Sequence, residues 1–220
     1  SIIIPFPQDE TMFYIFTTKD IWDASGEHSY ELSYSVVDIK EIGGATLGEV
    51  VAEDVPLFMK STERIAAIET GFGYWLLTHE FGNNPFRAYP ITENGIGPPV
   101  LSSIGSPHNQ TVKEYGEGYM KFSPDGTKVA VALATPMGNF VELFDFDPQT
   151  GQLSNYVQIE LTEDFNDYQV YGVEFSSGSE KLFVTLNNET SPQSRLYELK
   201  IHNFNKDSIE DNIELMAEES

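Results

Sequence analysis

A repeat of about fifty residues restricts the fold of this chain more than any other feature of its sequence. The segment FSPDGTKV, at 122–129, has a partner in FSSGSEKL, at 175–182, so that the leading phenylalanines are 53 residues apart. Phe144 and Tyr197, in the similar segments VELFD and RLYEL, have the same separation of 53. Two independent anchors with one spacing indicate a structural repeat.

Each repeat unit is predicted to form four short strands joined by tight turns. In the clearest copy the strands are expected over residues 118–123, 128–134, 140–147 and 153–161. Between the first two, Pro124 sets the φ angle of a turn, Asp125 can bond to nearby backbone, and Gly126 accepts a positive φ. Within 140–147 polar and apolar residues alternate, which is typical of a strand whose polar face points away from an apolar one.

Weaker copies precede this one along the chain. The second unit is predicted to have strands over 64–70, 74–80, 85–92 and 98–105, and the first over 2–5, 12–18, 32–40 and 47–57. An insertion at 19–30 is expected to form an extended surface loop, and only the acidic tail at 208–220 allows a helix. The chain is therefore predicted to hold four units, with approximate bounds 1–58, 59–113, 114–167 and 168–220.

A four-stranded unit of this length cannot bury both faces of its sheet alone, whereas radial stacking of such sheets does bury them. The predicted fold is therefore all-β, a β-propeller of four four-stranded blades. A β-sandwich also uses short strands with frequent turns, but it does not predict a 53-residue repeat. Four blades can close into a ring. Because the chain starts within a strand-rich pattern and without an export signal, we expect instead a partial segment of a larger ring of about seven blades.

The composition excludes several classes of function. Lys and Arg number 12 and Asp and Glu 35, and the resulting net charge of −23 excludes a basic nucleic-acid footprint or docking on anionic lipid. With 40% hydrophobic and 13% aromatic residues the chain is nonetheless expected to fold. The absence of cysteine excludes disulfides, thiolate zinc sites and cysteine nucleophiles. No apolar run approaches the ~18–20 residues of a membrane span, and residues 1–7, SIIIPFP, do not read as a secretory signal.

Three segments in order, GYMKFSPDGTK at 118–128, VELFDFD at 141–147 and YGVEFS at 171–176, resemble a WD40/YVTN-like propeller. More narrowly, they resemble the propeller of Bacteroidetes cell-surface proteins that carry a gliding-motility-associated, type IX secretion C-terminal sorting domain. Upstream segments at 34–38, 61–65 and 105–108 fit the same pattern. The resemblance implies an extracellular or cell-surface location and a role in recognition or scaffolding, without a defined catalytic activity. Ser177-Gly178-Ser179 departs from the Pro-Asp-Gly turn of the family, and the surface location is implied by the resemblance rather than by a motif within these 220 residues.

The four histidines lack the close spacing of a metal site. His79 is expected at a strand end with a hydrogen bond to backbone. His108, which follows a proline, resembles a histidine that connects propeller blades and donates to neighbouring backbone. His28 and His202 are expected at the surface.

Asp145 and Asp147 are two residues apart in a predicted strand and therefore share one face. Such a pair is compatible with a hard cation such as calcium. The simpler interpretation is that Asp147 caps the following turn beside a solvated Asp145. The sequence contains no calcium-loop, serine-hydrolase or phosphate-binding motif. No cofactor is therefore predicted, and calcium is the one that the sequence leaves open.

Aromatic side chains can either pack or contact a ligand. For Tyr74, Trp75, Phe81 and Tyr115 packing between blades is the simpler explanation, because aromatic side chains bury the largest areas. Trp22, in the predicted insertion, is the exception and is a candidate for ligand contact.

Two functions are compatible with these features. The leading hypothesis is a non-enzymatic interaction or scaffolding module, outside the cell or at its surface, that binds a protein or carbohydrate partner through its blade loops. The alternative is a lactonase-type propeller that hydrolyses a sugar lactone or related cyclic ester at the central channel, which the inner strands line. The candidate ligand-binding residues are Trp22, His28, Tyr119, Lys121, Tyr171 and Glu174, the last four on the inner strands; no catalytic or metal-binding residue is assigned.

The expected partners follow from the same arguments. Nucleic acid and membrane insertion are not expected at a net charge of −23, which instead suits solubility outside the cell. The remaining blades of the ring are expected from the rest of a parent chain or from self-association.

Overall fold

The computed structural model describes residues 1–22, 28–42, 45–108, 117–162, 168–188, 193–202 and 204–219. These residues form antiparallel strands and one short helix, α1 (Lys206–Glu210). The first eight strands are β1 (Ile2–Phe6), β2 (Asp9–Trp22), β3 (His28–Ile42), β4 (Ala45–Thr70), β5 (Gly73–Glu80), β6 (Pro85–Thr92), β7 (Gly95–Ile96) and β8 (Val100–Ser103). The last eight are β9 (Met120–Phe122), β10 (Lys128–Thr135), β11 (Gly138–Asp147), β12 (Gln152–Thr162), β13 (Tyr168–Phe175), β14 (Lys181–Asn188), β15 (Ser194–Lys200) and β16 (Glu214–Glu219). Within the described ranges no helix is long and apolar enough to cross a membrane.

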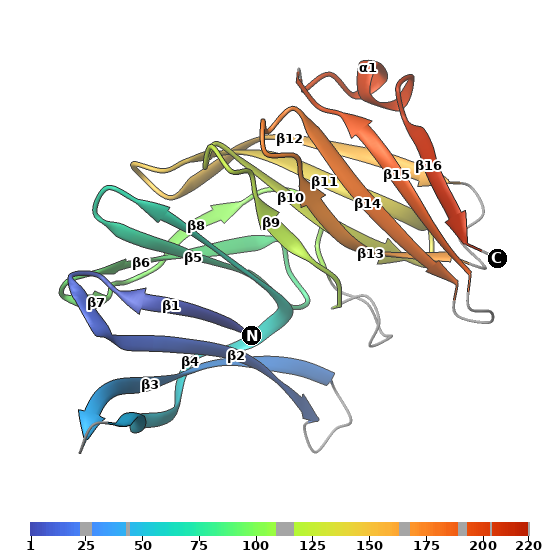
Figure 1. The fold of residues 1–220 in the computed structure, drawn as a ribbon. Coiled ribbons are helices and arrows are strands. Elements are labelled where there is room, and N and C mark those ends of the chain that lie inside the picture. Colours follow the sequence, from blue (N-terminus) through green and yellow to red (C-terminus); the bar gives the residue numbers. More distant parts are fainter. Residues whose placement is uncertain are drawn as a thin grey trace.

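The strands form three sheets, which Figure 1 shows fanned in chain order from the blue N-terminal end to the red C-terminal end. An eight-stranded sheet contains β1 to β8, and two four-stranded sheets contain β9 to β12 and β13 to β16. The eight-stranded sheet consists of two blades that share β4. The fold is therefore an all-β propeller with four blades, as predicted. Blade 1 has β1–β3 and the first part of β4, blade 2 has the second part of β4 with β5, β6 and β8, blade 3 has β9–β12, and blade 4 has β13–β16.

β4 is one continuous strand of 26 residues that belongs to two blades. Its first part pairs with β3 and its second part with β5. The change occurs at Ser61, which pairs with Tyr30 on β3 and with Glu80 on β5. The sequence predicted two separate strands here, over 47–57 and 64–70. The residues between them continue the extended backbone instead, with shifts in register where the strand changes partner.

The structure corrects one further expectation and limits another. Within the insertion at 19–30, expected as a surface loop, residues 19–22 and 28–30 instead lengthen the β2–β3 hairpin, in which Trp22 pairs with His28; residues 23–27 lie outside the described ranges. In the tail at 208–220, the one segment that allowed a helix, residues 208–210 belong to α1, and residues 214–219 form β16, the outer strand of blade 4. In both places pairing with a neighbouring strand satisfies backbone groups that a loop leaves to water.

The 53-residue interval holds at the first hairpin of blades 3 and 4 and changes at the second. In both blades the leading phenylalanine of the repeat pairs with the residue 7 positions later. Across the next hairpin Val129 pairs with Phe144, whereas the equivalent Leu182 pairs with Leu199, two residues beyond Tyr197. Because the shift is even, every side chain stays on the same face of its sheet.

Both sheet faces of blades 2 and 3 are buried, because each of these two blades packs against a neighbouring blade on either side. Three hydrophobic clusters lie between successive blades. On β10, Val129 and Val131 belong to the cluster shared with blade 2, and Ala130 and Ala132 belong to the cluster shared with blade 4. A side chain that points away from one core therefore points into the next, and alternation along such a strand does not mark a solvated face.

Trp75 connects blades 2 and 3, in agreement with the predicted packing of aromatic residues between blades. Its side chain is 4% exposed, its indole N–H donates to the carbonyl of Pro148 at 2.9 Å, and its ring meets Phe146 edge-on. Gly151, in the β11–β12 turn, has a φ of +75°, and a Cβ atom there would lie 2.7 Å from the indole ring. The turn therefore needs glycine for its conformation and for the close approach of the tryptophan.

We expect Gly151→Ala to lower the free energy of unfolding by about 1–3 kcal/mol, because the added methyl group meets the indole and the backbone is left-handed. For a chain of this size that corresponds to a fall of roughly 3–10 °C in Tm. Thermal denaturation measures it. Gly178→Ala is the matched control, because no atom lies within 4 Å of a Cβ at that position. Equal effects of the two substitutions would contradict this packing of blade 2 on blade 3.

Candidate functional site

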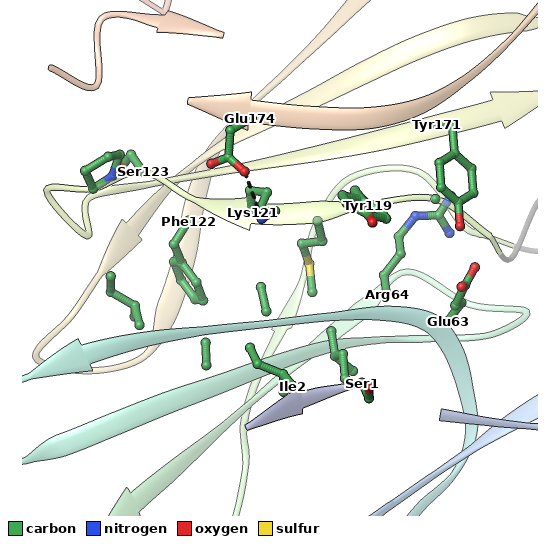
Figure 2. A pocket seen from close by; sticks show the side chains of 17 residues that line it. Ser1, Ile2, Glu63, Arg64, Tyr119, Lys121, Phe122, Ser123, Tyr171 and Glu174 are labelled. Carbon is green, nitrogen blue, oxygen red and sulfur yellow. Dashed lines mark ion pairs between the residues drawn. The ribbon is translucent and has the colours of Figure 1, made fainter. Parts of the chain in front are cut away.

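A cavity of about 560 Å³ lies where the inner strands of the blades meet. Its lining comes from the start of the chain, the second part of β4, β9 with the residues that precede it, and β13. Figure 2 shows charged and aromatic side chains gathered around it. Four of the candidate residues from the sequence are among the lining residues, namely Tyr119, Lys121, Tyr171 and Glu174.

Two tyrosines form one side of the cavity. The rings of Tyr119 and Tyr171 are 5.4 Å apart between centroids, at an angle of 50°. Tyr119 is 49% exposed and Tyr171 36% exposed. The backbone N–H of Tyr119 donates to the carbonyl of Tyr171 at 2.9 Å, which joins blade 3 to blade 4 at this point. The backbones from which the two rings project are thus joined, while part of each ring remains open to solvent.

An ion pair stands beside the tyrosines. The Nζ atom of Lys121 is 2.8 Å from Oε2 of Glu174, as the dashed line in Figure 2 marks, and it lies 5.7 Å from the centroid of the Tyr119 ring. Both charged side chains are substantially exposed. An exposed ion pair contributes little to stability. Because both side chains are exposed, the ammonium group of Lys121 and the carboxylate of Glu174 remain accessible at the rim of the cavity.

Arg64, on β4, is a buried cation at the other end of the cavity, where Figure 2 places it near Tyr171 and Glu63. Its Nε and Nη2 atoms donate to the carbonyl of Ala132 at 3.0 and 2.8 Å, and Nη2 also donates to the carbonyl of Glu117. Burial lowers the pKa of Arg64 to about 10, with nearby carboxylates acting in the opposite direction. The guanidinium is therefore charged at neutral pH.

A buried carboxylate, that of Glu142 on β11, lies between blades 2 and 3. Its Oε2 atom is 3.1 Å from Nε2 of His108, and its Oε1 atom accepts the backbone N–H of Ser106 at 3.0 Å and the hydroxyl of Tyr156 at 2.9 Å. Glu142 is 0% exposed. The alternation in 140–147 had predicted polar residues on a face away from the core, and for Glu142 this expectation is wrong because the second face packs against another blade.

Two histidines accompany this carboxylate. The rings of His79 and His108 stack with their centroids 3.6 Å apart, and both side chains are fully buried. The Nδ1–H group of His79 donates to the carbonyl of Glu80 at 2.7 Å, which confirms the predicted backbone bond at a strand end. His108 follows blade 2 and contacts blade 3, but its imidazole donates to the carboxylate of Glu142 rather than to backbone. His202 is exposed, as predicted.

Both buried histidines are neutral at pH 7. Burial, then the neighbouring His108 and Arg64, hold the pKa of His79 well below its usual 6.5; burial and Arg64 do the same for His108. With one ring nitrogen of each histidine used as a donor, the other is unprotonated. Nε2 of His79 and Nδ1 of His108 have no hydrogen-bond partner within the described residues. The pair acts in the packing of blades 2 and 3, and neither ring is among the residues that line the cavity.

The remaining sequence candidates are only partly placed. Trp22 and His28 pair through their backbones near the end of the β2–β3 hairpin, and their side chains lie outside what the structure describes, as does Tyr115. Glu63 and Arg64, which also line the cavity, were not among the candidate residues from the sequence. The signal that could have found Arg64 is an arginine directly before the apolar run IAAI of an inner strand.

No group of three or more His, Asp or Glu side chains in the described part of the chain is arranged to hold a metal ion. Asp147 accepts the backbone N–H of Gln149 at 2.9 Å and the hydroxyl of Thr150 at 2.8 Å, so it caps the turn as predicted. These hydrogen bonds lower the pKa of Asp147. Asp145 accepts from the side-chain amide of Asn155 at 3.0 Å.

No protein-family model matches this chain, and no curated protein matches it either. A putative 6-phosphogluconolactonase from Bacteroides uniformis shares its fold, with a TM-score of 0.51 and 12% identity over 98% of this chain and 70% of that one. The hydrazine synthase of Kuenenia stuttgartiensis gives a TM-score of 0.47 and 18% identity over 98% of this chain and 47% of that one. The periplasmic gluconolactonase of Pseudomonas aeruginosa gives a TM-score of 0.47 and 12% identity over 99% of this chain and 71% of that one.

These comparisons concern the fold. The structure from Bacteroides uniformis places the chain among the β-propellers. The chain spans about half the length of the hydrazine synthase chain that it matches.

The geometry of the cavity suits binding of a polar molecule that also has apolar faces. Aromatic rings that are partly open to solvent cover apolar faces, and a few charged groups nearby fix orientation through hydrogen bonds. The acidic side chains that line the cavity are Glu63 and Glu174, and the second is paired with Lys121.

Because the pKa values of the buried histidines His79 and His108 are lowered, we expect the free energy of unfolding to fall in acid. Because their folded pKa lies below the unfolded value of about 6.5, the unfolded state binds more protons below that pH, and stability falls as the pH decreases from about 6.5. Each histidine contributes about 1.4 kcal/mol per pH unit in that window, down to its folded pKa. We expect urea midpoints to fall between pH 7.5 and 5.5.

His79→Phe separates this effect from the titration of surface carboxylates, because phenylalanine keeps a stacked ring at this buried position and removes the proton site. In the variant the free energy of unfolding is expected to change less steeply with pH, by the slope that corresponds to about one bound proton. An unchanged slope in His79→Phe would contradict the neutral, buried state of this histidine.

Proposed function

We propose that this chain is part of a non-enzymatic propeller that recognises a carbohydrate at the cavity on its inner strands. The observation that carries the proposal is the pair of exposed tyrosines, Tyr119 and Tyr171, held 5.4 Å apart beside the ion pair of Lys121 and Glu174.

The chemistry of a sugar fits this arrangement. A pyranose ring has apolar C–H faces, which pack on aromatic rings, and hydroxyl groups, which exchange hydrogen bonds with Lys, Glu and Arg side chains. The volume of about 560 Å³ lies within the range of small-molecule sites, roughly 300–1,000 Å³. Because a backbone hydrogen bond already joins Tyr119 to Tyr171, little backbone entropy is lost there when a ligand binds.

The same proposal places the protein at the cell surface or outside the cell. The net charge of −23 supports it, because a strongly charged surface favours solubility and rejects anionic surfaces. The ordered motifs that resemble Bacteroidetes proteins with a type IX secretion, gliding-motility-associated sorting domain support it as well. In that setting further blades come from the rest of a parent chain or from a second copy, and the propeller serves recognition or scaffolding.

The second candidate is a lactonase-type hydrolase acting on a sugar lactone or related cyclic ester. It is favoured by the two carboxylates on the inner strands, Glu63 and Glu174, since a carboxylate can act as a general base toward water. Lactone hydrolysis that is lost in Glu63→Gln would support this candidate over the binding module.

A glycan array followed by calorimetry on the best neutral oligosaccharide tests the binding proposal. Tyr171→Ala is expected to weaken binding at least ~10-fold, because it removes one of the two aromatic surfaces. Lys121→Met, which keeps the aliphatic stem, is expected to weaken it roughly 3–10-fold through loss of a charged donor. Phe72→Ala, an exposed aromatic in the β4–β5 turn that does not line the cavity, is the matched control and should leave affinity unchanged.

Two outcomes would overturn the proposal. One is the absence of any glycan ligand on the array, and the other is an affinity that Tyr171→Ala leaves unaltered.

A further inference from the structure

A second concave surface, which we call the rim groove, lies at the ends of blades 2 and 3. It has a volume of about 480 Å³ and is bounded by the β4–β5, β9–β10 and β11–β12 turns. It adjoins the cavity of about 560 Å³ at Ile68 and Pro124 and otherwise has its own lining. It is therefore a separate surface, formed by the end of β4 and the three turns.

Apolar side chains make up much of the rim groove. Phe72 is 41% exposed, and its ring stands edge-on to that of Trp75 with centroids 5.4 Å apart. Ile68, Pro124 and Pro148 complete the apolar surface. Because Trp75 is itself buried and bonded to Pro148, the exposed phenylalanine is supported from below.

The turns around the rim groove are held by their own hydrogen bonds. Asp125 accepts the hydroxyl of Ser123 at 2.6 Å and the backbone N–H of Thr127 at 3.0 Å, and its own N–H donates to the hydroxyl of Ser179 in blade 4 at 3.2 Å. Asp147 caps the β11–β12 turn on the opposite side. A surface that is already ordered loses little entropy when a partner binds.

The rim groove is negatively charged. Its lining includes the exposed acidic residues Glu69 and Asp125 and contains no Lys, Arg or His among the described residues. Burial acts to raise the pKa of Asp125, but hydrogen bonds from Ser123 and Thr127 leave this pKa below its usual value. Lys128 does not line the groove; its Nζ atom donates to the hydroxyl of Thr127 at 3.2 Å, and its charge contributes to the lowered pKa of Asp125. A partner that complements this surface carries positive charge around an apolar centre.

We propose that the rim groove binds an extended peptide segment in which one large apolar side chain is flanked by lysine or arginine. The apolar side chain packs between Phe72 and the two prolines, and the flanking cations face Glu69 and Asp125. A segment of this kind matches the groove in charge and in apolar surface at once. The inference goes beyond carbohydrate recognition and does not depend on it.

Fluorescence anisotropy with labelled short peptides tests the inference on the full chain. The probe set has one central leucine, phenylalanine or tryptophan between pairs of lysines or arginines. We expect at least one member to bind, with a loss of at least ~5-fold in Phe72→Ala. We expect a loss of roughly 3-fold in Glu69→Gln, together with a weaker dependence on salt. Replacing the central residue by serine, or the cations by glutamate, should abolish binding.

Met137→Ala is the matched control, because Met137 is 78% exposed in the turn between β10 and β11 and does not line the groove. Circular dichroism establishes whether each variant is folded. If Phe72→Ala does not fold, Glu69→Gln still tests the inference, because Glu69 is exposed. Binding by none of the peptides, or binding that neither Phe72→Ala nor Glu69→Gln weakens, would overturn the inference. Tyr171→Ala should leave peptide binding intact, so failure of this inference and failure of carbohydrate recognition are distinguishable.

Discussion

Removal of a carboxylate from water costs several kcal/mol unless other donors replace the lost hydration. Glu142 meets this requirement inside the interface of blades 2 and 3, where His108, Ser106 and Tyr156 all donate to it. Two of these donors lie on the segment that leaves blade 2, while Glu142 and Tyr156 lie on blade 3. A displacement of one blade relative to the other would remove His108 and Ser106 and leave the buried carboxylate with Tyr156 as a donor from its own blade, so this contact ties the two sheets in one relative position.

The geometry of the cavity depends on this alignment. Arg64 reaches from blade 2 to the carbonyl of Ala132 in blade 3, and Tyr119 in blade 3 donates to Tyr171 in blade 4. The inner strands are thus linked one after another by hydrogen bonds between blades. Tyr119 and Tyr171, which would contact a sugar, belong to different blades. The distance between their rings therefore depends on these contacts between blades.

The repeat and its local turn chemistry made the propeller predictable. Residues 124–126 specify a tight turn by themselves, and the strands of blade 3 were expected within about two residues of where they lie. Features that depend on a neighbouring sheet were not predictable in this way. The change of partner at Ser61 makes β4 continuous, and Glu142 sits in a pattern that would equally describe a solvated face. The repeat predicted both Tyr119 and Tyr171 on inner strands; in the structure Tyr119 directly precedes β9 and Tyr171 lies on β13. Their contact depends on how blades 3 and 4 pack.

The most direct test of blade-to-blade packing is a double-mutant cycle between His108 and Glu142, using His108→Leu, Glu142→Gln and the combination in urea denaturation. The two residues are 34 positions apart in sequence and meet only if blade 2 packs on blade 3 as described. The account predicts a coupling energy of about 2 kcal/mol or more, since both partners are fully buried. A coupling energy near zero would contradict it.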